Sequence, residues 1–254
     1  MSLRVVITGA SSGIGQALAS EYARRGATLG LIARREQVLQ EFAAGLKVPA
    51  ALYPLDVRDA AGMARAGEDF CARFGSPDVV IASAGVSAGT STERSADRAV
   101  FQEILDVNVM GMVNTFAPFL PALRAAGAGT LVGIASVAGF RGIPGSGAYS
   151  GSKAAAITYL ESLRVELRGS GIAVVTICPG YIDTPMTRGN PYRMPFMIPA
   201  HVAAGRMVRA IARRRRQVVI PWQMGIVGAI LKMLPRALYD RMFARAPRKP
   251  RRDQ

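Results

Sequence analysis

A serine, a tyrosine and a lysine in the second half of the chain suit proton transfer to a carbonyl oxygen. Tyr149 precedes Lys153 by four residues. Because this is about one helical turn, the phenol and the ammonium are expected on one face of a helix. Ser136 follows an apolar run and can hydrogen-bond a carbonyl oxygen beside the phenol. Reduction of a ketone by hydride requires a proton for the alkoxide, and Tyr149 is the predicted donor.

The expected role of Lys153 is to lower the pKa of Tyr149. An unperturbed phenol has a pKa of about 10. A positive charge about 5 Å away, at an effective dielectric of about 20, contributes roughly 3 kcal/mol, or about two pKa units. The spacing therefore predicts a pKa of about 8 for Tyr149. Taken alone, this spacing is common by chance, and it gains weight from Ser136 and from a glycine-rich turn near the N-terminus.

That glycine-rich turn, residues 8–15, joins the first apolar run to a helical stretch. Glycine permits a sharp turn, and the free N–H groups and dipole of a helix N-terminus suit a pyrophosphate. The spacing G-x-x-x-G-x-G departs from G-x-G-x-x-G, and a tight loop without a ligand is the alternative. The expected dinucleotide contacts in this turn are Gly9, Ser11, Ser12, Gly13, Ile14 and Gly15.

The second apolar run ends at a basic pair, Arg34 and Arg35, where a carboxylate would select NAD. Two guanidinium groups can hold a 2′-phosphate, so NADP is the predicted cofactor and NAD the less favoured one. An exposed arginine pair that begins a helix is the alternative, and Glu36 is expected in that helix's first turn. Asp56 and Val57, after the third run, are expected near the adenine, with a helix cap as the alternative for Asp56.

Seven apolar runs of strand length alternate with helix-length amphipathic stretches. Short apolar runs without alternation are typical of strands buried on both faces, and the helices between them supply parallel crossovers. This order predicts a single α/β domain with a doubly wound parallel sheet, the Rossmann fold, and a ligand crevice at the carboxyl ends of the strands. The runs are residues 5–8, 29–33, 51–55, 79–82, 130–135, 173–178 and 218–220.

The composition fits one large domain and narrows the classes of partner. The 254 residues are 50% hydrophobic and 19% charged, with a formal net charge of +15. Residues 213–216 and the last twenty hold much of the excess, which favours a solvated edge and tail, so no nucleic acid partner is expected. Two cysteines and one histidine form no disulfide framework or ligand cluster, so no metal is expected. Without a signal-like segment or a membrane-length apolar run, a cytoplasmic location is expected.

Taken in chain order, these motifs resemble the short-chain dehydrogenase/reductase family over about residues 3 to 220. The resemblance adds Asn108 to Ser136, Tyr149 and Lys153 as the catalytic set, with Asn108 holding a water on the Lys153 side of a proton relay. It also implies that Thr184 meets the nicotinamide carboxamide, with a helix cap as the alternative, and that the chain forms homodimers or homotetramers. The further cofactor contacts expected are Ala84, Gly85, Tyr149, Lys153, Pro179, Gly180, Ile182 and Thr184.

One departure from the family follows the fourth apolar run. The family usually has Asn-Asn-Ala-Gly where this chain has Ala82-Ser83-Ala84-Gly85. The two missing amides remove hydrogen bonds that brace this loop, and Ser83 can replace one of them at most. The loss of these hydrogen bonds is expected to affect the affinity for the cofactor.

These features together predict an NADP-dependent oxidoreductase that transfers a hydride between nicotinamide and a carbonyl or secondary alcohol. Residues 183–199 are expected to form a mobile cover, and their apolar side chains favour a lipophilic or bulky substrate. A redox sensor that binds NADP(H) without turnover is the alternative, against which the intact Ser136, Tyr149 and Lys153 argue. The apolar side chains of the cover are Met186, Tyr192, Met194, Phe196 and Met197.

The sequence predicts a catalytic domain, residues 1–220, followed by an apolar helical extension packed on it, 221–246. A basic disordered tail is expected at 247–254. The apolar side chains of the extension require a cover. Packing over the pocket or across an oligomer is favoured, and contact with a membrane is the alternative. A helix flanked by Trp222 and many arginines is too short to span a bilayer but can lie in an anionic interface.

Overall fold

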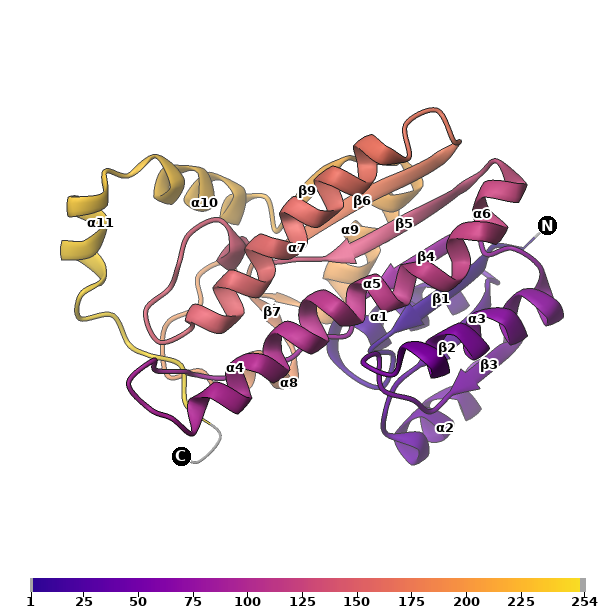
Figure 1. The fold of residues 1–254 in the computed structure, drawn as a ribbon, viewed down its shortest axis with the longest axis horizontal. Helices are drawn as coiled ribbons and strands as arrows, with labels where there is room; N and C mark the ends of the chain where they lie inside the picture. Colours follow the sequence, from indigo (N-terminus) through magenta and orange to yellow (C-terminus); the bar gives the residue numbers. More distant parts are fainter. Residues whose placement is uncertain (1, 252–254) are drawn as a thin grey trace.

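The computed structural model describes residues 2–251, in which a seven-stranded sheet lies between two layers of helices (Figure 1). All neighbouring strands are parallel, in the order β3-β2-β1-β4-β5-β6-β9. The order reverses between β1 and β4, which opens a crevice at their carboxyl ends. The predicted doubly wound α/β fold is therefore confirmed. The strands are β1 (Arg4–Thr8), β2 (Thr28–Ile32), β3 (Ala50–Tyr53), β4 (Val79–Ala82), β5 (Gly129–Ile134), β6 (Ile172–Pro179) and β9 (Gln217–Ile220).

The helices bury the two faces of the sheet in separate apolar clusters. Leu18, Leu39 and Met207 belong to the cluster under α1, α2 and α9, whereas Phe70 and Leu160 belong to the one under α3, α5, α6 and α7. Because both faces are covered, all residues of β2 and β5 are buried, as their continuous apolar runs predict. The helices are α1 (Gly13–Ala23), α2 (Glu36–Ala44), α3 (Ala60–Phe74), α4 (Asp97–Leu105), α5 (Gly111–Phe116), α6 (Leu120–Ala126), α7 (Gly147–Glu166), α8 (Pro185–Arg188), α9 (Ala200–Ala212), α10 (Gln223–Met233) and α11 (Arg236–Phe243).

Two features near the crevice escaped the sequence analysis. β7 (Ile182–Asp183) and β8 (Ile198–Pro199) form a separate parallel pair that closes the segment containing α8. A π-helical turn, Asp106–Met110, joins α4 to α5. Strands of two residues and a single widened turn are too short to produce a hydrophobic period.

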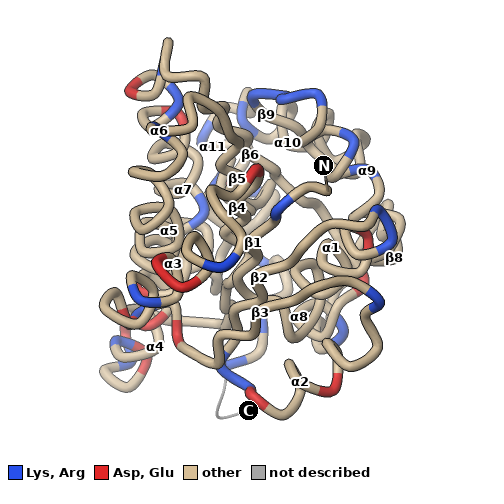
Figure 2. Tube along the Cα trace, turned by 90° about the vertical axis from the view of Figure 1, so that its right-hand side faces the viewer, with Lys and Arg blue, Asp and Glu red and all other residues tan. Residues whose placement is uncertain are grey.

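The basic excess lies mainly on the outside of the molecule (Figure 2). The arginines at 213–216 are all exposed in the turn that precedes β9. This agrees with the solvated edge that the sequence predicted.

Helices α10 and α11 stand beside the sheet, next to the loop that follows β5 (Figure 1). A Cβ atom on Gly228 would lie 2.6 Å from Phe140 Cδ2, so α10 packs closely on that loop. The Arg141 guanidinium donates to the carbonyl oxygens of Leu231 and Leu234, each at 3.0 Å, and satisfies the end of α10. Within residues 2–251, no helix is long and apolar enough to cross a membrane.

After α11 the chain turns back toward α4 and α8 (Figure 1). The Gly89 N–H donates to the Pro250 carbonyl at 2.9 Å, and Arg251 Nε lies 3.6 Å from Asp97 Oδ2. Residues 247–251 therefore make defined contacts instead of the disordered tail expected there, because partners distant in sequence hold them. Residues 252–254 of that expected tail lie outside the described residues.

Candidate active site

The loop after β5 and the first turns of α7 bring the three predicted side chains together. Ser136 lies two residues after the end of β5, and Tyr149 and Lys153 lie one turn apart near the start of α7. Lys153 Nζ donates to the Ile134 carbonyl at 2.8 Å and lies 5.8 Å from the centroid of the Tyr149 ring. All three predicted side chains line the same cavity.

Burial dominates the acid–base properties of this group. Although part of Tyr149 is accessible from the cavity, burial raises the pKa of its phenol, and a hydrogen bond with Ser136 only partly opposes this. Burial also lowers the pKa of Lys153 to about 8. The predicted lowering of the Tyr149 pKa is therefore wrong for this structure. The prediction considered only the attraction between the phenolate and the ammonium. It left out the desolvation of both groups, which is the largest cause of both pKa shifts.

Asn108 lies in the π-helical turn, behind the cavity wall. Its Oδ1 accepts from the Val86 N–H at 2.8 Å, and its Nδ2 donates to the Val86 carbonyl at 3.0 Å. A Cβ atom on Gly85 would lie 3.3 Å from Asn108 Oδ1 and 3.6 Å from Lys153 Nζ, so both side chains face Gly85. The structure thus places Asn108 on the Lys153 side, and its role in holding a water stays a prediction.

Ser152 is a buried residue that the sequence analysis missed. Its hydroxyl accepts from Asn108 Nδ2 at 2.9 Å and donates to the Tyr149 carbonyl at 2.8 Å. This chain of two hydrogen bonds fixes the start of α7 relative to the π-helical turn. A serine inside a helix commonly bonds its own backbone, so its type alone gave no signal.

The glycines of the first turn are required by close backbone approach. Gly9 has φ of 69°, and a Cβ atom there would lie 2.9 Å from Ala84 Cα. A Cβ atom on Gly15 would lie 2.3 Å from the Gly9 carbonyl oxygen. The side chain of Ser12, at the N-cap of α1, makes no capping hydrogen bond. The helix N-terminus therefore keeps N–H groups for an anion, and the turn fits a pyrophosphate.

Thr8 braces the loop that lacks the family's amides. Its Oγ1 accepts from the N–H groups of Ser83, at 3.1 Å, and Ala84, at 3.3 Å. The same hydroxyl donates to the Ile81 carbonyl at 3.4 Å. A buried threonine on β1 thus holds the loop through its backbone, a contact between residues far apart in sequence.

Arg34 and Arg35 lie at the end of the cavity beside β2. Arg35 Nη2 donates to Ser11 Oγ at 3.2 Å, which links the arginine pair to the glycine turn. Helix α2 begins at Glu36, as predicted. The alternative, an exposed arginine pair at the start of a helix, is correct about the exposure of both side chains. Both side chains also line the cavity, as a cofactor contact requires.

Asp56 is held by arginines and does not cap a helix. Its Oδ2 lies 2.7 Å from Arg58 Nη2 and 3.7 Å from Arg34 Nη1, and the hydrogen bond with Arg58 lowers the pKa of this carboxyl. Asp59 is the cap of α3, where its side chain accepts from the Gly62 N–H at 2.9 Å. The cap alternative for Asp56 was therefore wrong.

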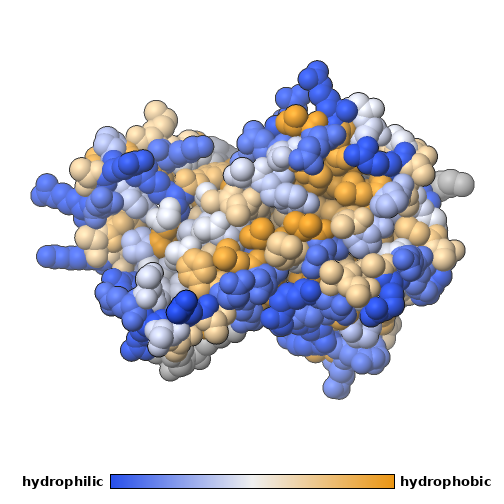
Figure 3. All heavy atoms as spheres, in the orientation of Figure 1, coloured by the Kyte–Doolittle hydropathy of each residue, from blue (hydrophilic) through white to orange (hydrophobic). Residues whose placement is uncertain are grey.

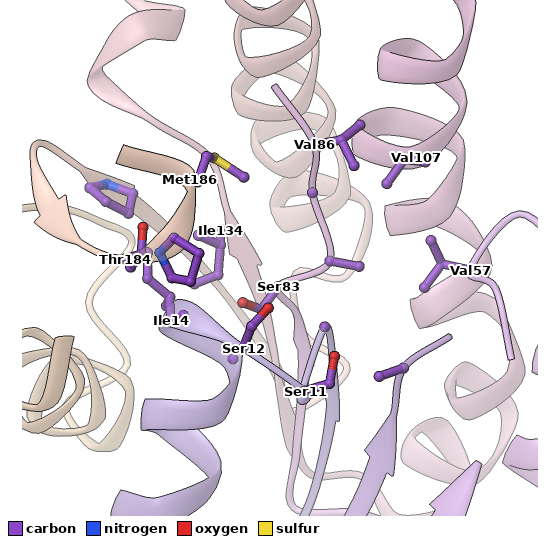
Figure 4. A pocket seen from close by; sticks show the side chains of 18 of the residues that line it. Ser11, Ser12, Ile14, Val57, Ser83, Val86, Val107, Ile134, Thr184 and Met186 are labelled. Atoms are coloured by element: carbon purple, nitrogen blue, oxygen red, sulfur yellow. The ribbon is translucent and has the colours of Figure 1, made fainter. Parts of the chain in front are cut away.

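Every predicted cofactor contact lines one cavity at the carboxyl ends of the strands. Figure 4 shows Thr184 and Met186 on one side of it, Val57 and Val107 on the other, and Ser12 between them. The lining residues that were not predicted are mostly apolar. Apolar side chains do not indicate a functional site by their type, so they could not be chosen from the sequence. The predicted lining residues are Gly9, Ser11, Ser12, Gly13, Ile14, Gly15, Arg34, Arg35, Asp56, Val57, Ala84, Gly85, Ser136, Tyr149, Lys153, Pro179, Gly180, Ile182 and Thr184, together with Met186 of the predicted cover. The added ones are Ala33, Leu55, Ser83, Val86, Val107, Ile134, Ala135, Pro185 and Thr187.

The sequence of this chain matches a known protein family. The family model described as short chain dehydrogenase matches residues 4–193. The chain belongs to this family. It is 39% identical over 244 residues to an uncharacterized oxidoreductase of Myxococcus xanthus, which covers 94% of this chain and 96% of that protein.

Two solved structures are similar to this short-chain dehydrogenase. One is the L-sorbose reductase from Gluconobacter frateurii complexed with NADPH and L-sorbose, at 26% identity and a TM-score of 0.78 over 86% of this chain and 95% of that one. The other is a short chain dehydrogenase/reductase from Burkholderia phymatum in complex with NAD, at 26% identity and a TM-score of 0.80 over 98% and 97%. The chain is an oxidoreductase of the class that acts on CH–OH or C=O groups.

The segment between β7 and α9 partly encloses the cavity of the dehydrogenase. Thr184 lines it and is also the N-cap of α8, where its N–H donates to Thr187 Oγ1 at 3.1 Å. The rings of Tyr181 and Tyr192 lie 6.5 Å apart, and Phe196 remains 50% exposed. The contact of Thr184 with nicotinamide and the mobility of this cover stay predictions.

In the dehydrogenase, Lys153→Ala should slow alcohol oxidation and move the pH optimum to more alkaline values. Lys153 is charged below its pKa of about 8. A positive charge 5.8 Å from the ring favours the phenolate that must accept the proton, so the variant should lose more activity below about pH 8 than above it. The rate of oxidation measured against pH tests this. A folded variant with an unmoved optimum would show that Lys153 acts only in packing.

Proposed function

We propose that this protein is an NADP-dependent carbonyl reductase or alcohol dehydrogenase. The observation that carries the proposal is the single cavity in which Ser136, Tyr149 and Lys153 meet the glycine turn. The bound nicotinamide cofactor would donate or accept the hydride. Ser136 would orient the carbonyl oxygen, and Tyr149 would give it the proton. A raised pKa keeps Tyr149 protonated at neutral pH, which is the form that reduction needs.

The arginine pair supports NADP. Arg34 and Arg35 present their guanidinium groups at the cavity end where a ribose 2′-phosphate would lie. Asp56, which lies 3.7 Å from Arg34, is held more closely by Arg58, at 2.7 Å. The turn and helix N-terminus also fit NAD, which remains the less favoured cofactor.

The apolar cover supports a lipophilic or bulky substrate. Met186 lines the cavity, and the rings of Tyr181 and Tyr192 lie 6.5 Å apart in the same part of the chain. A redox sensor that binds NADPH without turnover is the second candidate. NADPH oxidation across a library of aldehydes and ketones tests the proposal, with products identified for every hit. Tight NADPH binding without oxidation of the cofactor by any member would favour the sensor.

We also propose that the chain forms homo-oligomers through the face of α4, α5 and α7. Apolar residues gather in the middle of this face (Figure 3). Met110, in the turn before α5, and Val165, on α7, are exposed. A second apolar strip on α10 includes Ile226, Ile230 and Met233. Basic residues outnumber acidic ones around it, with Asp240 the one acidic side chain in residues 222–251. Like charges oppose packing of this strip against an identical strip.

Val165→Glu should lower the oligomeric mass of the protein in solution, because a carboxylate would become buried in the interface. Met233→Glu, which places the same charge on α10, should leave that mass unchanged. Light scattering measures the mass of both variants, and flotation with anionic and neutral vesicles covers the membrane alternative. A mass lowered only by Met233→Glu would move the interface to α10. Salt-sensitive flotation with anionic vesicles that Met233→Glu abolishes would identify α10 as a membrane contact.

A further inference from the structure

The C-terminal part of the described chain brings a cation close to Tyr149 and Met186, at the edge of the cavity. We name residues 247–251 the C-terminal strap. Lys249 Nζ lies 6.0 Å from the centroid of the Tyr149 ring and donates to the Met186 carbonyl at 3.5 Å. Tyr149 and Met186 both line the cavity. Lys249 is thus a second lysine near the proton donor, contributed by a different element from Lys153.

Contacts on both sides of Lys249 hold the strap in place. A Cβ atom on Gly89 would lie 2.2 Å from the Lys249 carbonyl oxygen, so the strap fits only because Gly89 has no side chain. A Cβ atom on Gly145 would likewise lie 2.9 Å from Arg248 Cβ. Arg251 is anchored by the buried carboxylate of Asp97. The position of Lys249 is therefore defined by the fold.

The charge of Lys249 lacks an acidic partner. The side chain is half-buried, and burial lowers its pKa. Among residues 2–251 it forms no ion pair with a carboxylate. A half-buried ammonium without a counter-charge is unfavourable, and an anion beside it would relieve that cost.

A hollow that Lys249 lines is also positively charged. Its lining combines basic side chains, hydroxyl groups and backbone. Asp97, outside the lining, pairs with Arg251, so Arg248 and Lys249 are the lining cations that form no ion pair among residues 2–251. Such a lining suits a carboxylate, which accepts several hydrogen bonds. The lining residues are Thr90, Ser91, Gly145, Pro191, Arg248, Lys249, Pro250 and Arg251.

We propose that Lys249 binds an anionic group of the substrate while Tyr149 protonates its carbonyl, so that the substrate class is oxo acids with an otherwise apolar body. This inference rests on the proposed function. It adds a specificity-determining residue: the apolar cover would take the body of the substrate, and the strap would take its carboxylate.

The experiment compares carboxylates with neutral analogues in the full chain. The probes are phenylglyoxylate, 4-oxo-4-phenylbutanoate and 5-oxo-5-phenylpentanoate, each with its methyl ester, and kcat/KM is measured with NADPH. At least one acid should be reduced better than its ester. Lys249→Met should lower kcat/KM for that acid about tenfold or more and change the value for the ester less than about twofold. Lys249→Arg should retain the preference for the acid.

The matched control is Lys232→Met, which removes one exposed positive charge from α10. It should leave both values unchanged. Equal losses for acid and ester in Lys249→Met would overturn the inference and assign Lys249 to packing. Reduction of the esters with no preference for any acid would overturn it too, while the proposed function would stand. Absence of reduction for every probe and for the wider ketone library would instead remove the proposed function, and this inference with it.

A measurement on the unmodified chain covers the case in which Lys249→Met does not fold. Each acid is tested as an inhibitor of ester reduction beside its uncharged primary amide. Inhibition by the acid at a concentration about tenfold lower supports the inference. Equal inhibition by acid and amide would contradict it.

Discussion

Replacing Tyr149 by Phe should lower the turnover number for ketone reduction by at least about 100-fold, because only the transferable proton is lost. The ring would still pack on α7, where it faces Lys153. The affinity for NADPH should therefore change by less than about twofold. Steady-state NADPH oxidation and a fluorescence titration of NADPH measure the two quantities in the same preparation.

Tyr192→Phe is the matched control, since it removes a second phenol hydroxyl near the cavity. It should retain most of the activity. Activity of Tyr149→Phe within about threefold of the parent would contradict the assignment of the proton donor. Equal losses in both variants would show that hydroxyl groups there act in substrate binding.

Features that depend on a local pattern of residues were predicted correctly from the sequence. The apolar runs located every strand of the main sheet, and the glycine spacing located a turn in which Gly9 and Gly15 have no room for a side chain. The fold then brought Ser136, Tyr149 and Lys153 to that turn, because parallel strands end at one edge of a sheet.

The residues that the sequence analysis missed act through long-range contacts. Thr8 reaches the loop after β4, and Ser152 links Tyr149 to Asn108. Neither hydroxyl stands out by type or spacing. The C-terminal strap was missed for the same reason, because its anchors are Gly89 and the distant carboxylate of Asp97.

The error on the Tyr149 pKa has a different origin. Helical spacing predicted correctly that Lys153 lies near the phenol. Burial cannot be deduced from two residues, yet it raises the pKa of Tyr149 and lowers that of Lys153. Desolvation disfavours the charged form of each group, so the attraction between them is opposed by the same burial that brings them together.

Replacing both Arg34 and Arg35 by Ala should weaken NADPH binding by about 2 to 4 kcal/mol, or roughly 30- to 1,000-fold in Kd, while NADH binding barely changes. The physical reason is the 2′-phosphate, which NADH lacks and which two guanidinium groups would bind through charged hydrogen bonds. Titration of both cofactors against the variant and the parent measures the difference.

The control for this double variant removes two charges elsewhere. Arg213→Ala with Arg215→Ala lowers the net charge equally, in an exposed turn. It should change the affinity for NADPH only slightly, since neither arginine lines the cavity and exposed charges are screened by salt. If the Arg34 and Arg35 variant weakens both cofactors alike, the pair supports the glycine turn through the bond from Arg35 to Ser11. If only the binding of NADPH weakens, and the control variant does not show the same loss, then the position of the two arginines rather than the total charge selects the cofactor.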